Sequence, residues 1–348
     1  MPFTTDQIAR GSTYSLATYQ KKEPIDQINI QHVTLDWLIK NKEVSSFGNG
    51  SFKEPIFVSN GSNAQNYFGA DQVTYNERDP AKWTDFSYAN LHDGFWFDED
   101  RLTAAGIQMA ADGEDAVPTA VEKESLINLL SQSYRGLKNG IQESLAYEYL
   151  RDGSQSSKAI PGLAHLVRTS PNTGVVGGID AATATYWRNN ANTGITASDV
   201  VSEMQLTWDD CMRYGGMLPD FIVGGRAFVE NYRTQAGVTI NRQIQNGGNA
   251  KGGVSLDPSV SDLFFHGVPV VWDPTFEALD TLLGTTTQTK TAYFLNKSAI
   301  KLRPLKGEWM RNRKPESLPD RYVTYFGQTC KYGFTTNKRN ALAVLSIA

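Results

Sequence analysis

Residues 118–153 read PTAVEKESLINLLSQSYRGLKNGIQESLAYEYLRDG. Thr119 with Glu122 fits a capping box at the start of this stretch, and Gly153 supplies a stop at its end. Between them, apolar residues recur at the spacing of one helix face: Leu126, Leu130, Leu137, Ile141 and Leu145, with Leu129, Tyr134 and Leu150 widening the stripe. We therefore predict one helix over residues 120–151, about 48 Å long at about 1.5 Å per residue.

This helix is longer than one compact domain needs, which indicates a fold that uses the helix as an axis. Gly136 and Gly140 lie inside it, and each costs the helix about 1 kcal/mol relative to alanine. A coiled-coil strand is the weaker alternative, because these glycines and the ragged apolar spacing break the heptads.

Helical and strand-like patterns alternate after this helix. Residues 198–214 have the spacing of a second helix, whereas residues 241–262 are rich in Gly, Asn and Ser and are typical of a loop. The other elements that we predict are a helix over residues 226–232 and buried strands over residues 221–224, 268–272 and 292–295. This alternation is typical of an α/β or α+β domain.

Aromatic and polar residues alternate before the long helix, in residues 51–110. Pro55–Ser59 has the pattern of a strand, and an Asn60-Gly61 turn follows it. An isolated two-stranded ribbon is marginal in water, so we predict a long two-stranded excursion that packs on another surface. Its aromatic residues are Tyr67, Phe68, Tyr75, Trp83, Phe86, Tyr88, Phe95, Trp96 and Phe97. Residues 1–50 are mostly polar, and we interpret them as an extended arm.

The composition is that of a folded protein. The chain has 348 residues, enough for two domains or one large domain with insertions, and 40% of them are hydrophobic. Its net charge is only −4, which argues against a dedicated nucleic-acid binder. Two cysteines are no disulfide framework and indicate folding in a reducing cytoplasm. We expect no signal peptide and no transmembrane helix, because neither apolar pattern is present.

The small net charge hides two charged segments. Residues 71–115 carry eleven acids against three bases, a net charge of −8. Residues 297–339 carry eleven bases against three acids, a net charge of +8. Two solvated faces would explain this pattern, and so would contact between the two segments, within a subunit or between copies.

Motifs for catalysis are missing. The sequence has no phosphate loop, no H-E-x-x-H pair and no G-x-S-x-G elbow, and the glycine-rich run at Gly174 has no lysine after it. His165 and His266 lie in apolar stretches, so we expect core histidines, and we expect Cys211 to be a buried thiol. The acids at residues 98–100 lack EF-hand spacing. We therefore expect no cofactor and no metal ion.

Six segments follow one another along residues 160–340, and their order matters as much as their residues. They read IPGLAHLV (160–167), TGVVGGIDAATATYWRNN (173–190), CMRYGGMLPDFIV (211–223), FFHGVPVVWD (264–273), AYFLN (292–296) and YFGQTCKYGFTTNKRN (325–340). Together they resemble the major capsid proteins of tailed bacteriophages with the HK97 fold. The sequence departs from the family pattern at Tyr186-Trp187, where Trp-Trp is more common, and at Lys338-Arg339, which replaces two arginines.

The resemblance implies an α+β, HK97-like fold. Its parts would be an N-terminal arm over residues 1–50, an extended β-hairpin called the E-loop over 51–112, a peripheral domain over 113–199 with the spine helix at 120–151, an axial domain over 200–315, and return strands over 316–348. An E-loop lies over a neighbouring subunit in this family, which would explain why the aromatic excursion cannot bury its own side chains.

The resemblance also implies a function. We expect a major capsid protein that self-assembles through pentamers and hexamers into an icosahedral shell around the double-stranded DNA of a tailed phage, in the virion, after assembly in the host cytoplasm. It would be no enzyme, would touch DNA without sequence-specific contacts and would meet no membrane. Because the arm starts almost directly at Met1, we expect a separate scaffolding protein, besides a portal and a decoration protein.

Two other readings stay open. An encapsulin-like compartment shares this fold but encloses enzymes, so the contents of purified particles would distinguish it. A soluble α/β enzyme would remain a monomer in every condition, whereas a shell protein forms rings or megadalton particles.

The charged segments suggest how copies meet. We hypothesise that the −8 segment of one subunit docks partly on the +8 surface of its neighbour. The contact candidates are Trp83, Phe86, Tyr88, Phe95, Trp96, Asp98, Glu99 and Asp100 on the acidic side, and Arg311, Arg313 and Lys314 on the basic side.

Reversing the charge at Arg311, Arg313 and Lys314 should therefore hinder assembly, and added salt should weaken assembly of the wild type because it screens exposed charges. Light scattering of the purified protein would measure both effects. Assembly of the reversed variant at the wild-type level would sink the hypothesis.

Overall fold

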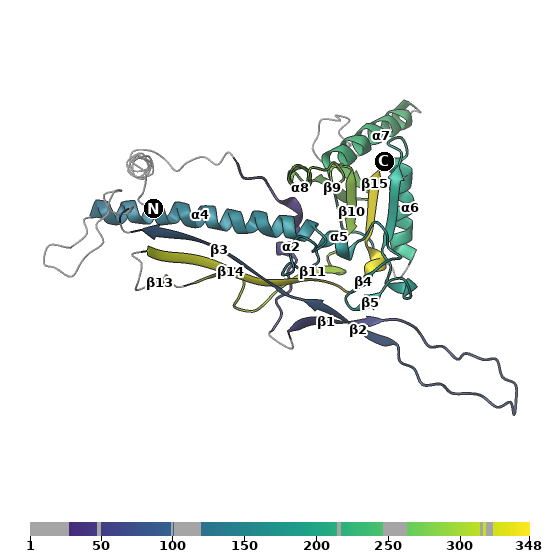
Figure 1. The fold of residues 1–348 in the computed structure, drawn as a ribbon. Helices are drawn as coiled ribbons and strands as arrows, with labels where there is room; N and C mark the ends of the chain where they lie inside the picture. The colour runs from purple at the N-terminus through teal and green to yellow at the C-terminus, as the bar shows by residue number, and fades with distance from the viewer. Residues whose placement is uncertain are drawn as a thin grey trace. The chain divides into compact units, whose positions relative to one another are not determined.

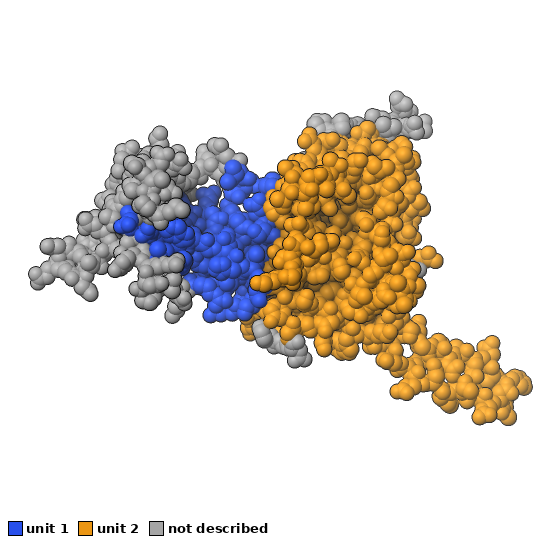
Figure 2. All heavy atoms as spheres, viewed as in Figure 1, with its two compact units in different colours: residues 1–30, 90–145, 307–331 blue, residues 31–89, 146–306, 332–348 orange. Residues whose placement is uncertain are grey.

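The structure is a computed structural model that describes residues 28–46, 50–98, 100, 120–213, 217–245, 263–313, 316–317 and 323–348. The chain forms two compact units, coloured separately in Figure 2. The smaller unit consists of residues 1–30, 90–145 and 307–331, and the larger unit of residues 31–89, 146–306 and 332–348.

The long helix is confirmed. Helix α4 spans Ala120–Leu150, one residue short of the predicted end (Figure 1). In the smaller unit its apolar stripe is used as the sequence indicates, because Leu137 and Ile141 are buried and Leu129 packs on the buried ring of Phe97.

A six-stranded sheet is the core of the larger unit. Its strand order is β6 (Asn190–Ile195), β15 (Ala343–Ile347), β10 (Thr291–Leu295), β7 (Phe221–Gly224), β9 (Val268–Trp272) and β8 (Leu263–Phe265). The pairs β6–β15 and β7–β9 are parallel and the others antiparallel. All residues of β7 and β10 are buried, as their unbroken apolar sequence predicts.

Helices cover both faces of this sheet. Helices α6 (Val200–Arg213) and α7 (Arg226–Gln245) share one apolar core with Ala292 and Phe294 of β10. Tyr293 lies between these two residues, so it points to the opposite face, where its ring packs 6.1 Å from Phe276 of α8 (Thr275–Leu283). The predicted strands at β7, β9 and β10 are confirmed. The predicted helix 226–232 continues to Gln245, and the predicted loop beyond that point lies outside the described residues.

The second sheet is built around strand β14 (Val323–Thr336). Its residues 332–336 pair with β11 (Ile300–Pro304) in the larger unit. In the smaller unit β14 pairs with β3 (Ala89–Asp98), β12 (Arg311–Asn312) and β13 (Glu316–Ser317). Residues 200–315, predicted as one domain, are divided between the two units, because residues 307–331 belong to the smaller unit. The structure places β11 and β12 beside β14, because their hydrogen-bonding partners come from the end of the chain.

The aromatic stretch 51–112 is likewise divided. Only β1 (Ser51–Phe57) and β2 (Ala81–Ser87) form the two-stranded antiparallel hairpin, with Phe52 opposite Phe86. Strand β3 follows after Tyr88 and pairs with β14, so Phe95 and Trp96 lie outside the hairpin. The sequence predicts Phe95 and Trp96 as part of the hairpin because its aromatic pattern continues without a break between β2 and β3.

The glycine-rich run near Gly174 forms a tight hairpin. Strands β4 (Val175–Val176) and β5 (Ile179–Asp180) are joined by Gly177 and Gly178, which have φ of +58° and +77°. Two positive φ values are the geometry of a two-residue hairpin turn, and glycine adopts them without strain. The indole of Trp187 donates to the carbonyl of Val176 at 2.8 Å, which fixes this hairpin on the turn that follows.

A buried arginine joins the end of the chain to this region. Arg339 is fully buried and donates to the carbonyls of Leu166 and Trp187 at 2.8 and 2.6 Å and to Oδ1 of Asn189 at 2.9 Å. Burial, with Arg168 nearby, lowers the pKa of Arg339 to about 10, so the guanidinium stays charged at neutral pH. Arg339 lies just before β15 and its acceptors precede β6, so its contacts hold together the two chain segments that form this parallel pair.

A buried carboxylate anchors the first described segment. Asp273 accepts from the backbone N–H of Thr34, at the start of α2 (Val33–Lys40), and from that of Thr275, at the start of α8. Both threonine hydroxyls also donate to it, at 2.5 Å. Nδ1 of His32 lies 2.8 Å from Oγ1 of Thr275. Because the Thr275 hydroxyl uses its proton to donate to Asp273, the imidazole of His32 must be the donor in this contact. One carboxylate therefore caps two helices.

Arg339→Ala is expected to lower the free energy of unfolding by about 3 kcal/mol or more, because it leaves the carbonyls of Leu166 and Trp187 without this donor and removes one of two donors from Oδ1 of Asn189. Urea unfolding would measure this loss. Arg226→Ala is the matched control, since Arg226 forms only an exposed i,i+4 pair with Glu230, worth less than about 1 kcal/mol. Equal losses in the two variants would contradict the assigned role of Arg339.

Candidate interaction surfaces

The root of the β1–β2 hairpin is held in the larger unit by two close approaches at glycine. A Cβ on Gly333 of β14 would overlap the ring of Phe52, and a Cβ on Gly177 would lie 2.7 Å from Cζ of Phe86. The inner face of the hairpin, which includes Ile56 and Thr84, is buried. Phe86 is therefore a packing residue of its own subunit, although the sequence suggested a contact with a neighbour.

The outer face and the end of the hairpin are exposed. Trp83, one strand position from a buried residue, keeps 65% of its surface accessible because it points to the opposite side. None of residues 58–80, which join β1 to β2, is buried. This connection carries Tyr67, Phe68 and Tyr75, with exposed fractions of 69%, 89% and 94%. These values describe a large unpartnered aromatic surface.

A local turn orders the aromatic end of this connection. The backbone N–H of Phe68 donates to Oδ2 of Asp71 at 2.9 Å, and the N–H of Asp71 donates to the carbonyl of Phe68 at 3.2 Å. Gly69 supplies a positive φ of +56° inside the turn. An aromatic ring and a carboxylate are thus presented together in this turn, which we call the Phe68–Asp71 turn.

Strand β3 of the smaller unit has two different faces. Phe95 stacks on Phe326 at 5.1 Å and meets Tyr134 of α4 edge-on at 5.2 Å, so it belongs to the core under the helix. Trp96 points to the other face and is 45% exposed. Alternation along a strand explains the difference between these neighbours, and Phe95, which is half-buried, packs within its own subunit. Tyr88, at the end of the hairpin, is half-buried.

The charged candidates are only partly available to a partner. Arg311 pairs with Glu308, and Arg313 (3.4 Å) and Lys331 (3.5 Å) approach the same carboxylate. This arrangement holds the pKa of Glu308 below its usual range, chiefly through the hydrogen bond from Arg311. Glu99 and Lys314 lie outside the described residues. Asp100 is exposed and Asp98 is half-buried.

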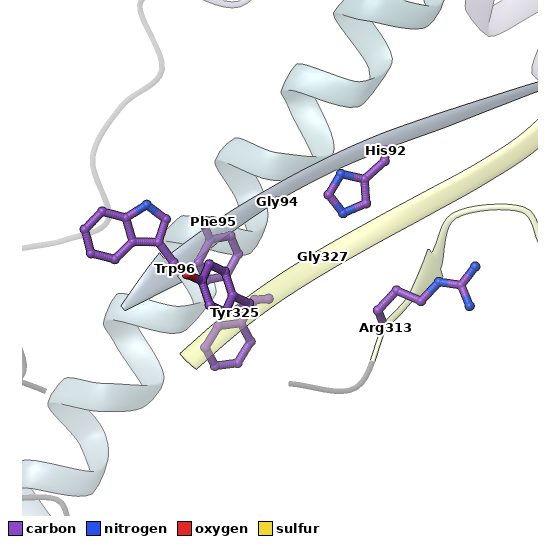
Figure 3. Close-up of a pocket in the computed structure, with 8 residues that line it drawn as sticks. His92, Gly94, Phe95, Trp96, Arg313, Tyr325 and Gly327 are labelled. Carbon is purple, nitrogen blue, oxygen red and sulfur yellow. The ribbon is translucent and has the colours of Figure 1, made fainter. Parts of the chain in front are cut away.

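A hollow of about 440 Å³ opens beside β3 and β14 in the smaller unit (Figure 3). Gly94 and Gly327 allow the strands to approach, because a Cβ on Gly94 would lie 2.7 Å from the carbonyl oxygen of Phe326 and one on Gly327 would lie 2.9 Å from Nε2 of His92. We call this hollow the β3–β14 notch. Its lining residues are His92, Gly94, Phe95, Trp96, Arg313, Tyr325, Phe326 and Gly327.

The remaining chemical candidates have structural surroundings. Cys211 is buried, and burial raises the pKa of its thiol to about 12. His165 is half-buried, with its pKa lowered mainly by burial. His266 is exposed, in contrast to the expectation, because it occupies a turn with φ of +49°, stacks on Trp208 and lies 2.6 Å from Oε1 of Gln205.

The described residues contain neither a candidate metal centre nor a candidate membrane-spanning helix. Within those ranges, no group of three or more His, Cys, Asp or Glu residues is placed to hold a metal ion. Among the helices of the same residues, none is both long and apolar enough to cross a membrane.

Gly333→Ala is expected to lower the free energy of unfolding by about 1–3 kcal/mol, because the new methyl group overlaps the Phe52 ring and overpacks the hairpin root. Chemical denaturation would measure this loss. Adding Phe52→Leu to the same chain should recover part of it, since the smaller side chain leaves room. Gly136→Ala is the control, because nothing lies within 4 Å of its Cβ position and alanine favours the helix. No loss for Gly333→Ala would contradict the close packing.

Known proteins match this chain by structure but not by sequence. No protein-family model matches the chain, and no curated protein matches it. The cyanophage A-1(L) capsid asymmetric unit matches with a TM-score of 0.58 at 12% identity, over 93% of this chain and 94% of that one. The capsid of Myoviridae phage XM1 matches with a TM-score of 0.53 at 11% identity, over 95% and 98%. The capsid of cyanophage P-SCSP1u matches with a TM-score of 0.53 at 12% identity, over 95% and 94%. The chain has the mixed α/β fold of these phage capsid proteins.

Proposed function

We propose that this chain is the major capsid protein of a tailed phage and that it works by self-assembly, not by catalysis. The observation that carries the proposal is the match of nearly the whole chain, both compact units included, to phage capsids. A fold alone can serve several functions. Two structural features favour a shell over the other functions.

The first feature is the exposed hairpin. Its root is packed tightly on its own unit, whereas residues 58–80 have no buried member and carry three largely exposed aromatic rings. Contiguous exposed apolar surface usually marks an interaction site. A second copy of the chain would cover this surface in a shell, and we propose that the hairpin lies over a neighbouring subunit as an E-loop.

The second feature is the kind of symmetry that such a contact produces. A hairpin that docks on a different surface of the next copy forms a heterologous contact, and heterologous contacts that close by rotation form rings. Pentamers and hexamers of this kind would build an icosahedral shell. One matched structure is the capsid of a native GTA particle computed with C5 symmetry, at a TM-score of 0.51 and 10% identity.

The parts of the fold then receive proposed roles. Helix α4 would be the spine helix of the peripheral domain, and the six-stranded sheet with α6, α7 and α8 would form most of the axial domain. The E-loop would be the β1–β2 hairpin, shorter than the sequence reading, since β3 pairs with β14. Strands β14 and β15 would be the return strands.

The proposed setting is the virion, after assembly in the host cytoplasm. Partners would be other copies of the chain, a separate scaffolding protein, a portal, a decoration protein and the packaged double-stranded DNA. A net charge of −4 suits a shell that must not hold its DNA tightly during packaging. The alternative is an encapsulin-like compartment, which would enclose protein cargo.

Particle formation and contents test this proposal. The expressed chain would be sized in solution and imaged by electron microscopy, alone and with the other structural proteins of its phage. We expect ring-shaped capsomers or closed shells, and nuclease-resistant double-stranded DNA inside particles from infected cells. Protein cargo in place of DNA would favour the compartment, and a monomer under all conditions would overturn both readings.

Replacing two exposed aromatic residues of the hairpin should separate assembly from folding. In Trp83→Ser with Tyr75→Ser, the free energy of unfolding should change by no more than about 0.5 kcal/mol for each site, because both rings are exposed. The yield of particles should fall strongly, because the rings would be buried only between subunits. Thermal melting and sedimentation would measure the two effects. Val175→Ser, at an exposed position outside the hairpin, is the control, and unchanged assembly of the double variant would contradict the proposed E-loop role.

A further inference from the structure

The β3–β14 notch combines apolar walls with positive charge. Tyr325 and Trp96 are partly exposed, and Figure 3 shows Trp96 and Arg313 at opposite ends of the group of side chains, with Tyr325 between them. The Arg313 guanidinium is held in place, because its Nε donates to Oγ1 of Thr329 at 2.9 Å. Such a site suits an aromatic side chain that has a carboxylate close by.

The ion-pair cluster that includes Arg313 holds more cations than carboxylates among the described residues. Three cations, Arg311, Arg313 and Lys331, share the single carboxylate of Glu308. Glu308 compensates one positive charge, so this cluster favours an anionic partner. Both adjacent strands carry glycine at the floor of the notch, and glycine inside a strand often marks a place where another chain approaches closely.

The Phe68–Asp71 turn has the complementary chemistry. Phe68 keeps 89% of its surface exposed and is tied by two hydrogen bonds to Asp71. The connection 58–80 that carries the turn has three acids against one base, a net charge of −2. An aromatic ring, a fixed carboxylate and an acidic surround therefore occur together on an exposed part of the same chain.

We propose that Phe68 of one copy enters the β3–β14 notch of a second copy, with Asp71 beside Arg313. This inference rests on the proposed function and narrows it, since it names the two surfaces through which the hairpin recognises its neighbour. The occupant is a second copy because charge and aromatic character complement each other within one sequence. Aromatic burial in the notch supplies the affinity, and the Asp71–Arg313 pair fixes the direction from which the turn enters.

A disulfide between copies tests the placement directly. The variant Phe68→Cys with Tyr325→Cys would be oxidised at a protein concentration high enough for rings or particles to form without the Phe68 ring, then separated on denaturing gels without reductant. The native thiols of Cys211 and Cys330 are buried and do not compete. We expect a reducible ladder of linked subunits in rings or particles. Phe68→Cys with Leu206→Cys is the matched control, because Leu206 is exposed on α6 of the larger unit and is not one of the residues that line the notch, and it should give no ladder.

A charge exchange provides a second readout that does not depend on cysteine geometry. Asp71→Arg and Arg313→Asp should each weaken assembly, by up to about fivefold in the concentration needed, as for exposed ion pairs. The double variant should recover part of the assembly, because the pair is restored with opposite polarity although arginine at position 71 cannot accept the hydrogen bond from the N–H of Phe68. Asp71→Arg with Arg311→Asp is the control and should not recover.

The outcomes separate the two proposals. If the wild-type chain forms no rings or particles, the proposed function and the notch proposal are both overturned. If particles form but the 68–325 variant gives no ladder and the charge exchange gives no recovery, the notch proposal is overturned while the shell function stands. A protein other than a second copy bound in the notch of assembled particles would overturn it as well.

Discussion

One buried guanidinium, that of Arg339, joins two segments of the larger unit that lie far apart in the sequence. Arg339 reaches two carbonyls and an amide oxygen, all from residues 166–189, and no carboxylate is among these acceptors. Moving a charge out of water is costly unless its donors are satisfied. Because these acceptors are main-chain or amide dipoles at fixed positions, the guanidinium is stable only when the segment before β6 and the segment before β15 are both in place. The parallel β6–β15 pair, and with it the position of β10, depends on that arrangement.

Asp273 follows the same logic with the opposite charge. Its carboxylate is fully buried, and four donors from the starts of α2 and α8 surround it. The positive ends of two helix dipoles compensate the charge, so no cation is required at these oxygens. Asp273 and Arg339, two of the buried charges in the larger unit, are therefore satisfied by local dipoles. This solution is specific in geometry, because dipoles must be aimed, whereas a flexible lysine could adjust to many arrangements.

Local patterns in the sequence were sufficient for the regular elements and insufficient for their partners. The capping box and apolar stripe predicted α4 to within one residue, and unbroken apolar runs located β7 and β10. The contacts of Asp273 and Arg339 span 239 and up to 173 positions, respectively, and no local pattern encodes such pairs. Aromatic composition alone also could not show that Trp83 is exposed and that Phe86 is buried. Strand alternation could have done so, because these residues lie three positions apart and so point to opposite faces.

The distribution of partners changes the meaning of the two charged segments. Arg339 is committed to the core, Arg303 pairs with Glu43 and Glu54, and Glu308 engages three more cations. Much of the +8 segment is thus neutralised or buried within one subunit. Attraction between whole segments would leave these internal pairs competing with any neighbour. Association through the exposed aromatic rings of residues 58–80, guided by a few local charges, avoids that competition. Burying these rings does not require any ion pair within the subunit to break. Assembly driven in this way should respond to salt less steeply than the segment charges suggest, because only the few charges at the contact are screened.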